Sequence, residues 1–178
     1  ATGLAGRPSL KFDGVDDYLS ASSLPGLTDL GQDRDLWMVC ENLTPAGTTG
    51  QRIAFRIGAA VETRNNLGRS SSGINRVRVV GGNGTAEVPV TNTSVVFEGP
   101  KVIHLDNRAD GVGVQIDNNP RVGVETTSAV TNTTIYLGAL TASASLFDGR
   151  INTAMVTTGL TPEETTKLRS YLMRRIGG

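Results

Sequence analysis

The sequence predicts an all-β fold, in which two antiparallel sheets pack as a sandwich and one C-terminal α-helix covers about residues 161–176. Three observations support this class. The 178-residue chain contains 22 glycines, and helix-forming runs are scarce before the C-terminus. Roughly a dozen short strand-like segments recur about every ten residues. A chain of this length can bury its own apolar core, so we expect residues 1–178 to form a single domain.

Two strands joined by a turn are predicted at the start of the chain, followed by a central strand. Leu10–Asp13 and Tyr18–Ser20 flank an Asp-Gly turn, so we expect them to pair as a hairpin. Asp35–Glu41 encloses an uninterrupted apolar run. Such a run is typical of a strand that is buried on both faces.

Two further strands alternate apolar residues with arginines. In Arg52–Ile57 the large apolar side chains fall on one face of the strand and the arginines on the other. The valines and arginines of Arg76–Val79 alternate in the same way. We therefore expect an exposed surface, the arginine face, formed by Arg52, Arg56, Arg76 and Arg78.

A second hairpin and two more strands complete the predicted sheets. Val112–Ile116 and Val122–Val124 both alternate, and residues 117–120 between them are Asp-Asn-Asn-Pro. Asp and Asn tolerate the positive φ angles that tight turns require. The remaining strands are Thr134–Leu137 and Arg150–Val156.

The C-terminal helix has a clear start signal. Thr161 and Glu164 form a capping box, and proline occupies the first helical position between them. Four residues recur at helical spacing and predict one apolar stripe: Leu168, Tyr171, Leu172 and Ile176.

Both ends of the chain resemble the laminin-G-like, concanavalin-A-like jelly-roll domains of bacterial and phage proteins. The opening residues 10–19, LKFDGVDDYL, resemble the first strands of that family. Residues 146–151, LFDGRI, followed by Leu160–Glu164 and the helix, resemble its closing strand and helix. Asn119-Pro120 departs from the Asn-Gly turn common in the family, and residues 43–100 carry no recognisable motif. The resemblance implies a jelly-roll sandwich that is often adhesive or glycan-binding, within a larger surface or virion protein.

The sequence offers little for catalysis. Enzymes with this fold are typically glycosidases with a Glu-x-Asp-x-Glu strand, and that motif is absent. His104 is the only histidine and Cys40 the only cysteine, so a His/Cys zinc site is excluded. No Gly-x-Ser-x-Gly elbow is present. We therefore expect no catalytic residues, no enzymatic activity and no cofactor except calcium. We expect His104 to be a strand residue satisfied by a neighbour.

Calcium is the one metal that the resemblance implies, at the rim of the sandwich. The candidate ligands lie in two turns, Asp13, Asp16 and Asp17 in the first and Asp106, Asn107 and Asp110 in the second. A calcium site needs about six or more oxygens. The same residue types also favour turns and N-caps, which is the alternative role.

The formal net charge is zero, but the charges are unevenly distributed. Acids outnumber bases over residues 1–41, and bases outnumber acids over residues 51–80. Guanidinium groups bind carboxylate and sulfate in bidentate fashion, so the arginine face is a candidate site for an anionic glycan. The alternatives are a solvated strand surface, or a docking site for the acidic N-terminal surface of a neighbouring subunit.

The sequence favours a non-catalytic structural or display module of a larger bacterial or phage assembly, such as a virion decoration, fibre or tail component. A carbohydrate-binding adhesion module is the first alternative, and a glycoside hydrolase-like enzyme is the second. The expected partners are proteins of an assembly or other copies of the chain, with surface glycans as a further candidate. Neither nucleic acid binding nor membrane insertion is expected. The expected location is a virion or a cell surface.

Overall fold

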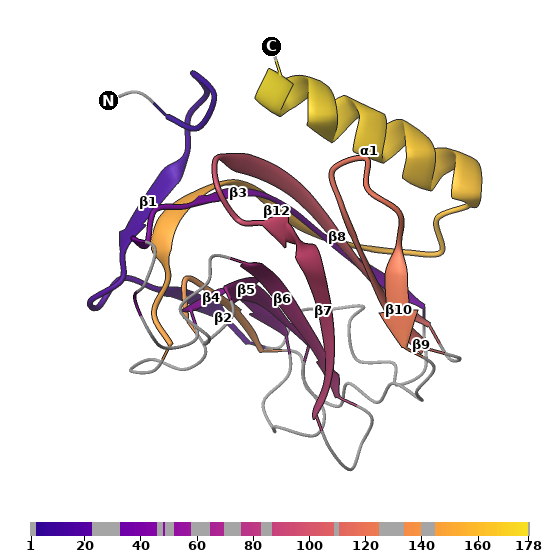
Figure 1. Cartoon of the computed structure of the whole chain (residues 1–178), viewed down its shortest axis with the longest axis horizontal. Helices are drawn as coiled ribbons and strands as arrows, with labels where there is room; N and C mark the ends of the chain where they lie inside the picture. Colours follow the sequence, from indigo (N-terminus) through magenta and orange to yellow (C-terminus); the bar gives the residue numbers. More distant parts are fainter. Residues whose placement is uncertain are drawn as a thin grey trace.

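The computed structural model describes residues 3–22, 33–45, 48, 52–57, 65–69, 76–82, 87–108, 111–124, 134–139 and 145–177. These residues form two six-stranded sheets and a C-terminal helix (Figure 1). Neighbouring strands are antiparallel throughout. The predicted two-sheet sandwich with one C-terminal helix is confirmed.

We call the first sheet the helix-covered sheet, and its strand order is β1-β12-β3-β8-β9-β10. Its strands are β1 (Leu10–Asp13), β12 (Asp148–Thr158), β3 (Arg34–Asn42), β8 (Pro100–Arg108), β9 (Gly111–Ile116) and β10 (Val122–Val124). The second sheet has the order β2-β11-β4-β5-β6-β7. Its strands are β2 (Leu19–Ala21), β11 (Ile135–Leu137), β4 (Arg52–Ile57), β5 (Asn65–Arg69), β6 (Arg76–Gly82) and β7 (Glu87–Val96). The first strand of each order, β1 or β2, lies at an edge of its sheet.

The central strand β3 is buried on both faces, as predicted. Leu36, Met38 and Cys40 belong to the apolar core between the two sheets. Trp37 and Val39 alternate with them and belong to a second apolar cluster on the outer face. Both faces of this strand are therefore covered by protein. This explains why apolar and polar residues do not alternate along its sequence.

Helix α1 (Pro162–Gly177) lies over the outer face of the helix-covered sheet (Figure 1). The predicted capping box is confirmed, because the Glu164 amide donates to Thr161 Oγ1 at 3.3 Å and the Thr161 amide donates to Glu164 Oε2 at 2.9 Å. The helix and sheet residues of the second cluster are Leu168, Leu172, Met173, Ile176, Trp37, Val39, Val102 and Met155. Tyr171 was predicted to share this stripe, but it is 50% exposed and turns outward. Within the described ranges, no helix combines the length and apolarity that crossing a membrane requires.

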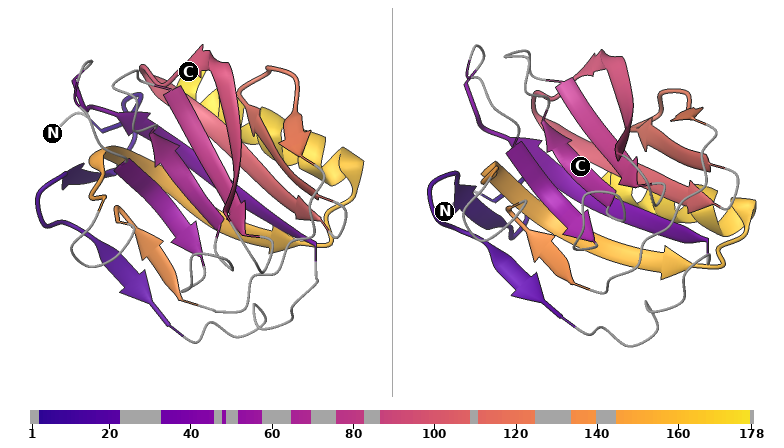
Figure 2. Two further views of the ribbon diagram at one scale, coloured as in Figure 1. Left: turned by 60° about the horizontal axis from the view of Figure 1, so that its bottom comes forward. Right: turned by 90° about the horizontal axis from the view of Figure 1, so that it is seen from below.

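The predicted N-terminal hairpin is wrong in its pairing. β1 pairs with β12 and β2 pairs with β11, so the two strands belong to different sheets. The intervening turn carries the chain from one sheet to the other, as Figure 2 shows. Gly14 adopts a φ of 77°, and the Val15 amide donates to the Asp13 carboxylate at 2.8 Å. The turn signal was therefore real, but it does not determine which strands pair.

The second predicted hairpin is confirmed. β9 and β10 pair antiparallel through Val112 to Val124 and Val114 to Val122. Asp117 adopts a φ of 52°, and the Asn119 amide donates to the Ile116 carbonyl at 3.0 Å. The Asp117 carboxylate also accepts the Val102 amide at 2.9 Å, which ties the turn to β8.

Replacing Leu172 with alanine tests the docking of α1. Leu172 is 1% exposed, so we expect Leu172→Ala to lower the free energy of unfolding by about 2–5 kcal/mol. Urea denaturation followed by the fluorescence of the sole tryptophan measures the change. Tyr171→Ala is the matched control on the same turn, and we expect it to cost less than about 1 kcal/mol because the ring is half exposed. Equal losses in both variants would contradict this packing.

Candidate functional site

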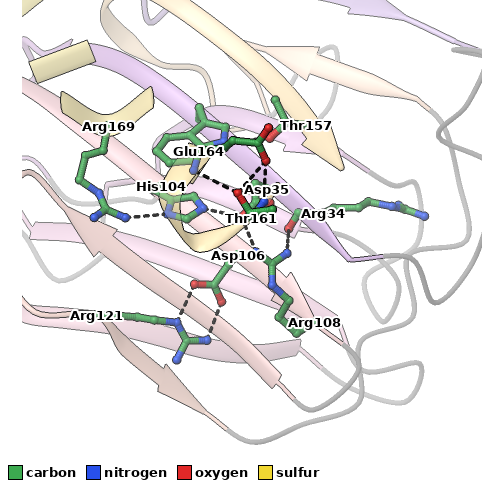
Figure 3. A network of polar contacts seen from close by, with 11 residues as sticks. Arg34, Asp35, His104, Asp106, Arg108, Arg121, Thr157, Thr161, Glu164 and Arg169 are labelled. Atoms are coloured by element: carbon green, nitrogen blue, oxygen red, sulfur yellow. Dashed lines mark hydrogen bonds and ion pairs between the residues drawn. The ribbon is translucent and has the colours of Figure 1, made fainter. Parts of the chain in front are cut away.

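A buried polar cluster lies between the helix-covered sheet and α1 (Figure 3). We call it the Asp35 cluster, and it consists of Asp35, His104, Arg108 and Arg169. The Asp35 side chain is fully buried, and its Oδ1 lies 2.6 Å from His104 Nε2 and 2.7 Å from Arg108 Nη2. Its other oxygen, Oδ2, has no hydrogen-bond partner among the described residues. One carboxylate thus joins β3 to β8 through two donors.

His104 connects this carboxylate to the helix. Its Nδ1 lies 3.3 Å from Arg169 Nη2 on α1. A guanidinium only donates, so we assign Nδ1 as the acceptor and Nε2 as the nitrogen that donates to Asp35. The ring stacks on Trp37 at a centroid distance of 3.7 Å, and Trp37 Nε1 donates to Thr157 at 3.0 Å. The prediction that neighbours satisfy His104 is confirmed.

The electrostatics of the cluster favour a charged Asp35. Burial raises the pKa of this carboxyl, but the hydrogen bonds from His104 and Arg108 and the positive charge of Arg108 outweigh that effect and hold the pKa below its ordinary value. Burial lowers the pKa of Arg169, and the negative charge of Asp106 partly offsets this. Three elements, β3, β8 and α1, therefore share one buried set of charges.

Asp106 lies beside this cluster and binds Arg121 (Figure 3). The two Asp106 oxygens accept from Arg121 Nε and Nη2 at 2.6 and 2.5 Å. Arg121 reaches across Gly113, where a Cβ would lie only 2.3 Å from the guanidinium. Any side chain at position 113 would therefore displace Arg121 from this bidentate pair.

The second candidate calcium set is divided by this arrangement. Asp106 is 5% exposed and is neutralised by Arg121. Asp110 lies outside the described residues, as does the side chain of Asn107. Asp106 offers no free oxygen for a cation, and a metal role for the other two stays a prediction.

The structure brings the first candidate set together. Asp13, Asp16 and Asp17 are all exposed, and one carboxylate oxygen of each lies within 4.8 Å of the others. The amides of Val15 and Asp16 donate to Asp13, and the amide of Asp13 donates to Asp17. The hydrogen bond from Val15 is the main reason that the pKa of Asp13 lies below its ordinary value. These carboxylates thus form the turn, and calcium binding there stays a prediction.

The arginine face differs from the predicted exposed surface. Arg56 is 3% exposed, and its guanidinium lies 5.3 Å from the ring centre of Tyr136. Arg52 donates to the carbonyl of Leu146 at 3.2 Å. The expected outward position of Arg56 is wrong because β11 pairs with β4 and places Tyr136 beside it.

The other two arginines of that face lie on β6. β5 separates β6 from β4, so the two arginine-bearing strands are not neighbours. The side chains of Arg76 and Arg78 lie outside the described part of the structure. Ligand binding by the four arginines therefore stays a prediction.

Sequence reasoning did not find the Asp35 cluster. Its four members come from β3, β8 and α1 and are as far apart in sequence as Asp35 and Arg169. The one available signal was a charged residue beside the apolar run of β3. Burial of both faces implies that such a charge needs an internal partner.

Comparisons with known proteins define the class of fold. No family model matches the sequence, and no curated protein matches it either. The structure is similar to mouse laminin alpha-1 chain domains LG4-5, with a TM-score of 0.64 and 15% identity over 84% of this chain and 40% of that one. It is also similar to the IT-sialidase CBM40 of Ruminococcus gnavus, solved bound to alpha2,3 sialyllactose, with a TM-score of 0.69 and 12% identity over 92% of this chain and 96% of that one.

A third similar structure is the full-length tailspike protein 2 of an Escherichia coli bacteriophage. Its TM-score is 0.66 at 13% identity, over 99% of this chain and 26% of the tailspike. This chain thus spans less than half of the laminin and tailspike chains. The fold is the laminin-G-like, concanavalin-A-like jelly roll that the sequence motifs predicted.

Replacing Asp35 with asparagine tests the buried cluster. The change leaves two donors without their charged acceptor, so we expect Asp35→Asn to lower the free energy of unfolding at pH 7 by about 3–5 kcal/mol. The folded-state pKa of Asp35 lies below the ordinary value of about 3.8 for this side chain. The stabilisation is therefore complete well above pH 3.8 and is lost as the pH falls through the folded-state pKa.

Urea titrations at a series of pH values measure both effects. The wild type should become less stable as the pH falls below about 4, because Asp35 is then protonated. We expect this decrease in the free energy of unfolding to be smaller in Asp35→Asn. Asp33→Asn is the control, because Asp33 is exposed, and we expect it to change stability by less than about 0.5 kcal/mol. An unchanged acid dependence in Asp35→Asn would show that Asp35 is not held as a carboxylate.

Proposed function

We propose that this chain is a non-catalytic structural module that packs against protein in a larger bacterial or phage assembly. The observation that carries the proposal is an exposed apolar surface at the two edge strands. We call it the N-terminal rim, and its residues are Leu10, Val15, Tyr18 and Leu19, which are 51%, 72%, 39% and 51% exposed. Large apolar side chains grouped at a surface with polar surroundings mark protein contact sites.

The rim adjoins concave surface that can accept side chains of a partner. A groove of about 340 Å³ lies between β1, β11 and β12, and its apolar lining includes Leu10, Leu137 and Ile151. A smaller groove of about 130 Å³ lies between β1 and the residues that lead into β2. Apolar projections beside apolar grooves favour a packed protein contact.

The polar groups of the described residues support a non-catalytic role. His104 is 3% exposed, and both of its ring nitrogens are occupied by Asp35 and Arg169. A general base must reach the proton that it abstracts, and α1 covers this ring. Asp35 and Asp106 are likewise buried and bound to arginines.

The attribution to a phage or bacterial assembly draws on the comparisons. The similar tailspike structure covers 99% of this chain, and the sequence motifs at both ends point the same way. These similarities support our proposal that the chain is one part of a larger structure in a virion or at a cell surface.

Mass spectrometry of purified virus particles or cell-surface assemblies from the organism that makes this chain tests the proposal. We expect the chain to be present in a constant ratio to other structural proteins through successive gradient purifications. A chain that separates from every particle fraction would contradict the structural role. Free ribosomal proteins are a suitable control for adventitious carry-over.

A carbohydrate-binding adhesion module is the second candidate. The observation in its favour is the similarity to the sialidase CBM40. The matched region covers 96% of the CBM40 chain, and the CBM40 was solved bound to sialyllactose. In this reading an anionic glycan contacts the arginine face, or calcium bound at Asp13, Asp16 and Asp17 supports the contact.

A glycan array probed with calcium and then with chelator separates the two candidates. For a structural module we expect no saturable binding in either condition and no hydrolysis of the glycans. Specific binding would support the adhesion module instead. Loss of glycan binding in Arg52→Ala/Arg76→Ala would assign the binding site to the arginine face. Loss of glycan binding with chelator would assign it to the acidic turn formed by Asp13, Asp16 and Asp17.

A further inference from the structure

The charges along β1 are arranged with opposite signs at its two ends. At the C-terminal end of β1 the charges are negative. Asp13, Asp16 and Asp17 are exposed there, and Asp148 on β12 lies opposite Asp13. Just before the N-terminal end of β1 the charge is positive. Arg7 is exposed there and donates to the carbonyl of Arg175 at 3.2 Å. Figure 1 shows this basic end beside the C-terminal end of α1 and the acidic turn at the far end of the strand.

The free edge of β1 continues this pattern. The amide of Asp13 points away from β12, because it donates to the Asp17 carboxylate at 3.1 Å. Alternation then directs the main-chain groups of Lys11 to the same free edge. Lys11 is exposed and forms no ion pair among the described residues, and its neighbour on β12, Arg150, is itself paired with Glu41. The nearest acid across the strands, Glu41, is thus already bound to Arg150, and Lys11 has no ion-pair partner of its own in the described part of the chain.

We propose that two copies of this chain associate about a twofold axis near Phe12, with their β1 strands antiparallel. The proposal rests on the structural role proposed above and names the partner as a second copy. A strand edge with one basic and one acidic end is complementary to a second copy of itself only when the two strands run antiparallel. A twofold contact has this property, and every favourable pair in it occurs twice.

The register about Phe12 places opposite charges beside each other, while the Asp13 amide keeps its hydrogen bond to Asp17. Lys11 faces Asp13 of the partner subunit, and the Lys11 amide is free to donate to the carbonyl of that residue. The basic end at Arg7 lies beside the partner's acidic turn. Leu10 lies opposite Gly14 of the partner subunit and next to the partner's Val15, so two exposed apolar side chains of the rim come close to each other. The dimer therefore covers the part of the rim at Leu10 and Val15 and neutralises the acidic turn.

Sedimentation velocity over a range of protein concentrations tests the proposal. We expect a reversible monomer–dimer equilibrium that weakens as sodium chloride is added, because the paired charges lie at the surface. Lys11→Glu places an acid opposite the partner's acids, and we expect it to raise the dissociation constant at least about tenfold.

A charge swap tests the antiparallel register. Asp16 accepts no hydrogen bond among the described residues, so Asp16→Lys leaves the turn intact. We expect Asp16→Lys alone to weaken the dimer, because it places a second base beside Arg7 of the partner subunit, and Arg7→Glu/Asp16→Lys to restore most of the lost affinity. Lys167→Glu on α1 is the matched control, because Lys167 lies far from the rim and pairs with Glu163. We expect this control to leave the dimer unchanged.

Three results would overturn the inference. They are a monomer at every concentration, a dimer that Lys11→Glu does not weaken, and growth into larger species, which a head-to-tail contact would produce. The particle measurement distinguishes these failures from failure of the proposed function. A chain that is present in particles but monomeric alone refutes only the twofold contact, whereas absence from particles refutes the structural role whatever the sedimentation shows.

Discussion

The packing of α1 on the outer face of the helix-covered sheet is the constraint on which the rest of the structure depends. It buries β3 on both faces, so a charged residue at position 35 can persist only with internal partners. His104 and Arg108 provide those partners from β8, and Arg169 provides the next contact from α1. The polar cluster and the apolar cluster around Trp37 are thus two parts of one interface. Each part requires the helix to be in place.

The two N-terminal strands show the opposite condition. β1 and β2 are short edge strands of four and three residues, and neither has a second neighbour among the described strands. Short edges with charged residues limit uncontrolled strand addition. Yet this edge also exposes four large apolar side chains, which a purely solvent-facing edge would not need. The combination of charge and apolar surface is typical of a selective contact rather than of a protected edge.

The sequence predicted most of what depends on local chemistry. The doubly buried β3, the β9–β10 hairpin and the capping box at Thr161 follow from residues close together in the chain, and all three are confirmed. Strand pairing across the sandwich could not be predicted, because a turn at Gly14 fits a hairpin and a sheet-to-sheet link equally well. Arg56 was misplaced for a related reason, since alternation does not reveal that Tyr136 covers the second face. The Asp35 cluster depends on contacts between distant residues.

The distribution of free and occupied polar groups indicates where this protein can bind. On the outer face of the helix-covered sheet, Asp35, Asp106 and Glu41 are each paired with an arginine. At the acidic turn, three carboxylates lie close together and form no ion pair with a base in the described part of the chain. Their mutual repulsion favours any cation that approaches, whether calcium or a basic side chain. Calcium at the turn would remove the charge that the proposed dimer needs to attract Lys11 and Arg7 of the partner subunit, so calcium and the second copy would compete for the same turn.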